Sequence, residues 1–116
     1  MNKRYRIKKQ REIDAIFKIR KSKGNAYFSV YRTTDKTQTV FRFAVTIGRK
    51  YGNAVERNLA KRRIRMILQG FKGLIATDAS FVIVIKPAAR TLTYQEMESN
   101  MGILLKKSNI LTETET

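Results

Sequence analysis

The segment from Arg49 to Arg65 holds seven of the chain's 25 Lys and Arg residues but only one acid, Glu56. If a helix begins at Asn53, a rotation of about 100° per residue divides the segment into two faces. The cationic face carries Arg57, Asn58, Lys61, Arg62 and Arg65, and the expected apolar face carries Val55, Leu59, Ala60, Ile64 and Ile67. Such a helix packs its apolar face on a core and leaves its charge outside. The pattern therefore predicts a basic helix on the surface of a packed domain.

The cationic face contains no acid that could offset its charge. Arg57, Lys61 and Arg65 follow one another at intervals of four residues, so they repel each other by roughly a few tenths of a kcal/mol per pair in an isolated helix. A solvated helix face usually mixes charges of both signs. The absence of acids on this face favours an anionic partner over a role in solubility alone.

The net charge of the whole chain points in the same direction. A formal charge of +16 on 116 residues opposes compaction by self-repulsion, and nucleic acid is the commonest partner that relieves it. Anionic membrane is the alternative. However, no apolar run approaches the roughly 18 residues of a spanning helix, and the N-terminal residues lack the apolar stretch of a secretory signal. We therefore expect a cytoplasmic protein that does not bind membranes.

The titratable residues argue against catalysis by the protein itself. The chain has no Cys and no His, which excludes disulfides, thiolate metal sites and the commonest general base. Its nine carboxylates are scattered along the sequence without an evident metal-ligand or acid–base spacing. We predict no catalytic residues and no metal site on the protein.

The first half of the chain predicts a basic N-terminal arm, a helix and two strands. Residues 1–11 form the arm, and Ile13, Ile16 and Phe17 supply the apolar stripe of a helix that ends before a turn at 21–25. Strands are expected at 26–33 and 40–47, joined by a polar turn. In the first strand, Tyr27 and Tyr31 share one face. In the second, Arg42 lies on a mixed face opposite an apolar one.

The second half predicts a helix, a central strand and a closing helix. The basic helix is expected to stop at Gly70, and the apolar run at 81–86 reads as a buried strand that ends before Pro87. Thr93 and Glu96 match a capping box for a helix whose apolar stripe is Tyr94, Met97, Met101, Leu104 and Leu105. Residues 112–116 are expected to fray. This order predicts one α+β domain over 1–116, an α/β sandwich with helices on a small central sheet.

The run from Gly52 to Arg65 resembles the signature of the bacterial ribonuclease P protein subunit, GNAV-x-RN-x-x-KR-x-x-R. The resemblance continues in RIKK at 6–9, YFSVY at 27–31, FRFAVTIGRKYGNA at 41–54 and KPA at 86–88, so it covers nearly the whole chain. It implies a non-catalytic cytoplasmic protein that joins a large catalytic RNA. The complex removes 5′ leaders from precursor tRNA and uses Mg²⁺. It also implies a left-handed crossover through the basic helix, although the general rule predicts a right-handed one.

The resemblance assigns roles to two groups of residues. The docking face for the catalytic RNA comprises Arg57, Asn58, Lys61, Arg62 and Arg65, whereas Leu59 departs from a position that is often basic. A cleft between the first helix and the sheet binds the single-stranded leader, with Phe17 and Tyr31 at matching positions and Ile13 where an aromatic is often found. Tyr27 and Arg42 join this group because of their strand faces.

Three other readings compete with this one. A generic RNA-binding module, KH-like or ribosomal, is suggested by the GxxG at 70–73, but a KH loop joins two helices, whereas this one leads toward a strand. A protein-only nuclease would need an acidic cluster that the sequence does not show. A membrane-surface protein would need the apolar face of the basic helix, which the core requires, and the chain has no Trp.

Overall fold

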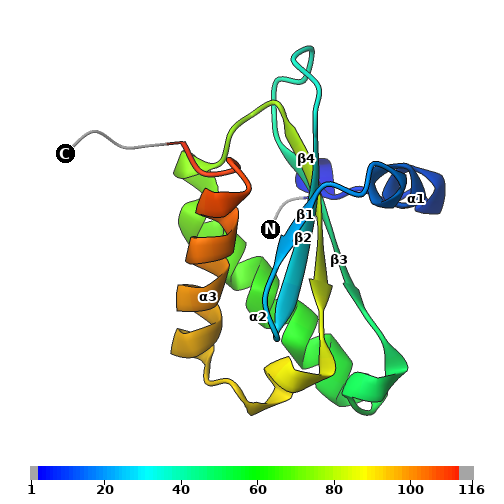
Figure 1. The fold of residues 1–116 in the computed structure, drawn as a ribbon, viewed down its shortest axis with the longest axis vertical. Coiled ribbons are helices and arrows are strands. Elements are labelled where there is room, and N and C mark those ends of the chain that lie inside the picture. The colour runs from blue at the N-terminus through cyan, green and yellow to red at the C-terminus, as the bar shows by residue number, and fades with distance from the viewer. Residues whose placement is uncertain (1–2, 113–116) are drawn as a thin grey trace.

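One mixed four-stranded sheet organises the chain, with α1 on one face and α2 and α3 on the other (Figure 1). The computed structural model describes residues 3–112, so most of the tail expected to fray lies outside the described residues. The strands are β1 (Ser22–Gly24), β2 (Phe28–Thr34), β3 (Arg42–Ile47) and β4 (Ala79–Ile85), in the order β1-β2-β4-β3. β2 is antiparallel to both neighbours, and β3 is parallel to β4. The expected α+β sandwich is confirmed.

The three helices are α1 (Gln10–Lys18), α2 (Ala54–Phe71) and α3 (Tyr94–Lys107). α2 is the crossover between the parallel strands β3 and β4, which places the basic helix on the face that it shares with α3. α3 begins with the predicted capping box: the Glu96 N–H donates to Thr93 Oγ1 over 3.1 Å, and the Thr93 N–H donates to Glu96 Oε1 over 2.9 Å. Four of the five predicted stripe residues of α3 are buried, namely Met97, Met101, Leu104 and Leu105.

The sheet separates two apolar clusters of unequal size. The larger one joins β2, β3 and β4 to α2 and α3, and Phe28, Phe43 and Phe81 are almost fully buried in it. The smaller one lies under α1 and consists of Ile7, Ile13, Ile16, Ala44 and Val82. β4 contributes to both clusters, so it is buried on both faces, as the continuous apolar run at 81–86 predicted.

Arg6 and Ile7, near the N-terminus, lie against the sheet. Arg6 forms a parallel bridge with Phe43, and the Ile7 N–H donates to the Phe43 carbonyl over 2.8 Å. The Ile7 side chain is buried in the cluster under α1. The predicted arm is therefore anchored at Arg6 and Ile7 to the outer edge of β3, while its other described basic residues are exposed, and it leads directly into α1.

Two element boundaries differ from those expected. The predicted turn at 21–25 contains the edge strand β1, whose polar sequence, Ser-Lys-Gly, gave no apolar alternation. α2 continues through Gly70 to Phe71, and no glycine in the described chain adopts the left-handed φ that commonly ends a helix. Gly70 therefore does not act as a helix stop.

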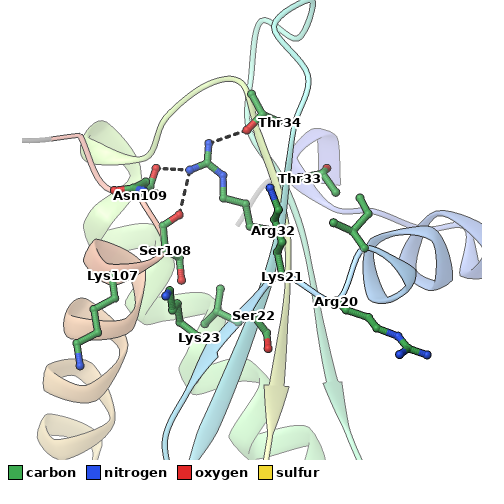
Figure 2. Close-up of a pocket in the computed structure, with 12 residues that line it drawn as sticks. Arg20, Lys21, Ser22, Lys23, Arg32, Thr33, Thr34, Lys107, Ser108 and Asn109 are labelled. Carbon is green, nitrogen blue, oxygen red and sulfur yellow. Dashed lines mark hydrogen bonds between the residues drawn. The ribbon is translucent and has the colours of Figure 1, made fainter.

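Arg32 fastens the end of α3 to the sheet (Figure 2). Its Nη1 donates to the carbonyls of Ser108 and Asn109, and its Nη2 donates to Thr34 Oγ1 over 3.1 Å. Asp78 lies 3.8 Å from the same Nη2. A cation at a helix C-terminus satisfies carbonyls that have no partner within the helix and opposes the helix dipole.

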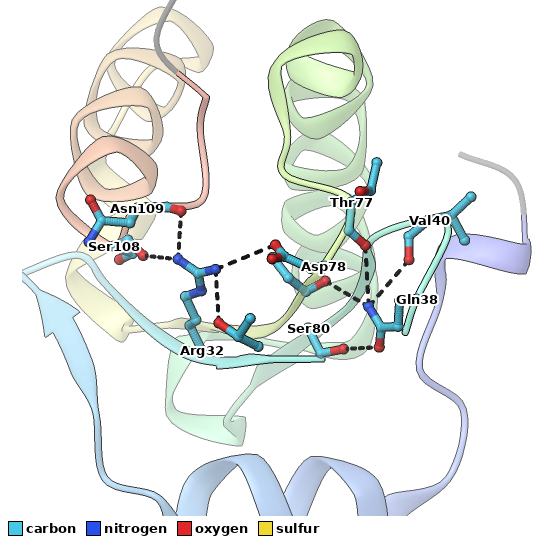
Figure 3. A network of polar contacts seen from close by, with 10 residues as sticks. Arg32, Gln38, Val40, Thr77, Asp78, Ser80, Ser108 and Asn109 are labelled. Carbon is cyan, nitrogen blue, oxygen red and sulfur yellow. Dashed lines mark hydrogen bonds and ion pairs between the residues drawn. The ribbon is translucent and has the colours of Figure 1, made fainter. Parts of the chain in front are cut away.

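Gln38 holds the connection between β2 and β3 against the start of β4 (Figure 3). Its Oε1 accepts from Ser80 Oγ over 2.7 Å, and its Nε2 faces the carbonyls of Val40, Thr77 and Ala79 at 3.3 to 3.4 Å. The two polar networks therefore fix the end of the sheet near the carboxyl end of β2.

Candidate RNA interface

The start of α2 is held by the single acid of the basic segment. The Glu56 N–H donates to Asn53 Oδ1 over 2.8 Å, and the Asn53 N–H donates to Glu56 Oε1 over 3.0 Å, which completes a capping box. The other carboxylate oxygen of Glu56 lies 2.6 Å from Arg90 Nη2. Asn53 therefore opens the helix as predicted. Glu56 is engaged at the cap and with Arg90, away from the cationic face.

Gly52 is required by this arrangement rather than by its backbone angles. A Cβ at position 52 would lie 2.6 Å from Glu56 Oε1 and 3.0 Å from Glu56 Cδ. We expect Gly52→Ala to displace the carboxylate and to lower the free energy of unfolding by about 1–2 kcal/mol, through loss of the cap and the exposed ion pair. Urea denaturation measures this loss.

A double substitution tests the cause of that loss. If Gly52→Ala acts through Glu56, then adding it to Glu56→Ala costs almost nothing further. Gly48→Ala serves as the control, because a Cβ at Gly48 meets no atom within 4 Å. Fully additive losses at positions 52 and 56 would contradict this explanation.

The cationic face of α2 is formed as predicted. Asn58 and Arg62 are exposed, whereas Arg57, Lys61 and Arg65 are half-buried at the border with the core. None of the five takes part in an ion pair within residues 3–112, where the pairs are Arg32–Asp78, Arg42–Glu12 and Arg90–Glu56. Arg57 Nη1 donates to the Gly52 carbonyl over 2.7 Å, which fixes that side chain beside the helix start. Arg57 is therefore held in place, and no carboxylate in the described residues neutralises the face.

Arg6 extends the cationic face beyond α2. Burial lowers the pKa of Arg65, and repulsion from the Arg6 guanidinium lowers it further. The Nε atoms of both residues are buried without a hydrogen-bond partner. The sequence patterns did not predict that Arg6 lies near Arg65. The density of basic residues near the N-terminus was the available signal, but only the bridge to Phe43 shows where Arg6 lies.

The apolar side of α2 differs from the predicted one. Ala60, Ile64, Ile67 and Leu68 are buried, but Val55 is 77% exposed and Leu59 44% exposed. Met66 is 56% exposed. At about 100° per residue, these three exposed side chains form a narrow stripe next to Arg62, on the side away from the core. The prediction that Val55 and Leu59 pack inward was wrong, because the core needs only one narrow side of the helix.

Phe17 and Tyr31 meet on the other face of the sheet. Their ring centroids are 4.9 Å apart and their planes are nearly perpendicular, at 89°, a favourable edge-to-face geometry. Both rings are partly buried and pack on the cluster under α1. Ile13 is only 9% exposed and belongs to that cluster. Ile13 therefore supports the aromatic pair from below and presents little surface of its own.

The remaining two residues predicted for the cleft lie elsewhere or are already paired. Arg42 Nη1 is 2.8 Å from Glu12 Oε2, so the pair connects β3 to α1. Tyr27 packs against the larger cluster, not the one that Phe17 and Tyr31 join. The strand alternation does not reach Tyr27, because β2 begins at Phe28 and Asn25 Oδ1 accepts from the N–H groups of both residues in a turn.

Three further observations bear on the alternatives. The GxxG at 70–73 covers the end of α2 and a single turn at Lys72–Leu74 that leads to β4, not to a second helix. Residues 3–112 contain no group of three or more acidic, His or Cys side chains placed to hold a metal ion. Within the same residues, no helix has both the length and the apolar character to cross a bilayer.

Comparison with known proteins identifies the family. The family model described as Ribonuclease P matches residues 1–109. The ribonuclease P protein component of Phytoplasma australiense is 40% identical, over 96% of this chain and 96% of that protein. The same component of Acholeplasma laidlawii is 41% identical, over 96% of this chain and 95% of that protein.

Solved structures agree with these sequence matches. The RNase P protein of Staphylococcus aureus superposes with a TM-score of 0.86 at 30% identity, over 93% of this chain and 98% of that one. The RNase P protein of Thermotoga maritima gives a TM-score of 0.79 at 27% identity, over 88% and 96%. The chain therefore belongs to the ribonuclease P protein family and is a subunit of the endoribonuclease that processes tRNA.

Proposed function

We propose that this protein joins the catalytic RNA of ribonuclease P through the cationic face of α2 and holds the 5′ leader of precursor tRNA beside α1. The observation that carries the first part is the set of cationic side chains on one face of α2 that form no ion pair in the described chain. Repulsion among Arg57, Lys61 and Arg65 is relieved when RNA phosphates approach them. Asn58 adds a neutral hydrogen-bonding group to the same surface.

The side chains on this face divide the work by their chemistry. The planar guanidinium groups of Arg57, Arg62 and Arg65 can each donate two parallel hydrogen bonds to a phosphate, which fixes its orientation. Lys61 contributes a point charge. Because Arg57 is held by the Gly52 carbonyl, it is already oriented before RNA arrives, and less conformational entropy is lost on binding.

We further propose that the leader passes over Phe17 and Tyr31. Bases of single-stranded RNA stack on aromatic rings without strict sequence preference, which suits leaders of varied sequence. The ion pair between Arg42 and Glu12 holds α1 at a fixed distance from β3, so we assign Arg42 a positioning role at the cleft. Tyr27 is placed with the larger core and is not part of the proposed cleft.

The proposal leaves catalysis to the RNA subunit. Mg²⁺ is held mainly by RNA in the holoenzyme and supplies the activated water and charge neutralisation that phosphodiester hydrolysis requires. The protein increases the local positive charge around the substrate and reduces the demand for free cations. The proposed place of action is the cytoplasm, where precursor tRNA is processed in bacteria.

Reconstitution with the catalytic RNA tests the proposal. At low Mg²⁺, we expect the protein to raise kcat/KM for precursor tRNA cleavage by one or more orders of magnitude over the RNA alone, since it supplies affinity for both RNA partners. The protein incubated with Mg²⁺ and precursor tRNA, without the RNA subunit, should not cleave. Failure to stimulate the catalytic RNA would favour a generic RNA-binding module, and cleavage by the protein alone would favour a protein-only nuclease.

A further inference from the structure

An open pocket of about 670 Å³ lies at the β1 edge of the sheet, apart from the α2 face (Figure 2). The end of α1 contributes Ile19 and Arg20, and β1 with the residue before it contributes 21–23. The outer edge of β2 contributes 32–34, and the end of α3 contributes 107–109. No residue of α2 lines it. The pocket is therefore a separate surface feature.

The pocket exists because β1 is shorter than β2. β1 pairs only with Ser29–Tyr31, so the following residues of β2, 32–34, have no strand beyond them on that side. Arg32, Ser108 and Asn109 close one wall through the hydrogen bonds that tie α3 to the sheet. The walls are thus fixed by pairing and packing and do not depend on a ligand.

The lining of the pocket is cationic. Arg20, Lys21, Lys23 and Lys107 line it, and no Asp or Glu does. Within residues 3–112, the side chains of these four make no hydrogen bond or ion pair, whereas Arg32 is engaged with backbone carbonyls. Ile19, which is 48% exposed, adds apolar surface, whereas Val30 is buried. Unpaired cations beside an exposed apolar side chain suit a phosphodiester chain with bases attached.

Arg20 supplies an independent indication. Its φ of 58° lies in the left-handed region, which L residues other than Gly, Asn and Asp adopt only at a cost. Gly would terminate α1 at this position without strain. An arginine held in a conformation suited to glycine is consistent with a role for its side chain.

The pocket adjoins the proposed leader cleft at the end of α1. The Arg20 N–H donates to the Phe17 carbonyl over 3.1 Å, and Tyr31 pairs with Ser22, which lines the pocket. Ile19 and Thr33 also line a smaller pocket of about 220 Å³ under α1. Glu12 and Asp35 also line that smaller pocket. Because Phe17 and Tyr31 lie on the α1 face and Arg32 contacts the end of α3, an RNA strand stacked on the two rings reaches the cationic pocket by passing the end of α1 around the β1 edge.

We propose that this pocket binds phosphates of leader nucleotides that lie beyond those stacked on Phe17 and Tyr31. The inference rests on the proposed function, because it extends the same leader path. It predicts that a longer leader gains affinity from the pocket, whereas a leader too short to reach it gains none.

The test uses the reconstituted holoenzyme and precursor tRNAs whose leaders grow by one nucleotide at a time. Arg20→Gly and Lys107→Gln should each weaken binding of long-leader substrates by about two- to fivefold and lower the log–log salt slope by about 0.7. Binding of the shortest leaders should not change. Lys106→Gln is the matched control, because Lys106 is exposed on the same helix but does not line the pocket.

Arg20→Gly also separates binding from folding. Since glycine relieves the positive φ, the thermal midpoint of the free variant should equal or exceed that of the wild type, while long-leader affinity falls. A lower midpoint would indicate a structural role for Arg20 and count against the inference. If the variants weaken binding equally at all leader lengths, the pocket contacts the catalytic RNA or the tRNA body instead of the leader. That result would overturn the inference.

Two results distinguish failure of this inference from failure of the proposed function. If wild-type affinity rises with leader length but the pocket variants follow the same curve, only the pocket inference fails. If wild-type affinity does not depend on the leader at all, the proposed leader-binding function fails, and the pocket inference fails with it.

Discussion

Arg62→Ala is expected to weaken binding of the catalytic RNA by about one to two orders of magnitude while leaving the protein as stable as before. Arg62 is exposed on α2, and no hydrogen bond or ion pair engages its side chain within residues 3–112. Loss of a charge-assisted contact to phosphate costs about 1.5–3 kcal/mol. The log–log salt slope of binding should fall by about 0.7–0.9, which filter binding over a range of KCl concentrations measures.

Arg57→Ala provides the informative comparison. The log–log salt slope of RNA binding by Arg57→Ala should also fall by about 0.7–0.9. In addition, loss of the hydrogen bond from Arg57 to the Gly52 carbonyl should lower the free energy of unfolding by about 1 kcal/mol. Unchanged slopes for both variants would show that neither side chain contacts phosphate and would remove the basis for the proposed docking face.

Phe81→Ala is expected to give the largest loss of stability, about 3–5 kcal/mol. Phe81 is fully buried on β4, with its ring centroid 6.1 Å from that of Phe43 and 6.3 Å from that of Phe41. Removing it opens a cavity where the sheet meets α2 and α3, and the neighbouring rings are too constrained to fill it. The total free energy of unfolding of a domain of this size is about 5–15 kcal/mol. The urea midpoint of Phe81→Ala should therefore be much lower than that of the wild type.

Phe81→Leu is the matched variant, because it keeps most of the apolar volume. Phe81→Leu should lower the free energy of unfolding by about 1–2 kcal/mol. Both variants should regain part of their stability in the presence of the catalytic RNA, since a partner that binds only the folded state stabilises it. A loss below about 1 kcal/mol for Phe81→Ala would show that the aromatic cluster repacks and does not determine the stability of the sheet.

Much of the fold could be predicted from local patterns in the sequence. Asn53 and Thr93 open α2 and α3 as expected, because a capping box depends on residues only three positions apart. Residues 81–85 of the predicted strand at 81–86 lie in β4, since a strand buried on both faces is rich in apolar residues along its length. The cationic face of α2 also followed from helical periodicity, whereas its docking role is a proposal that rests on the family resemblance.

Features set by long-range packing could not be predicted in this way. β1 has a polar sequence and becomes a strand only because β2 offers an open edge. The exposure of Val55 and Leu59 depends on how much of α2 the sheet and α3 cover. Tyr27 does not lie on the predicted strand face, because Asn25 Oδ1 accepts hydrogen bonds from the N–H groups of Tyr27 and Phe28 and forms a turn just before the strand. The left-handed crossover that the resemblance implies opposes the general rule, so no pattern in the chain indicates it.

The N-terminal segment along β3 has a consequence for the protein before it meets RNA. β3 is the last strand on its side of the sheet, and a bare outer strand offers unpaired peptide groups to the strand of another molecule. The bridge at Arg6 and the hydrogen bond from Ile7 occupy part of that row, and they bring like charges to the place where two molecules would have to join. Part of the β3 edge is thereby closed to pairing with the edge strand of a second copy.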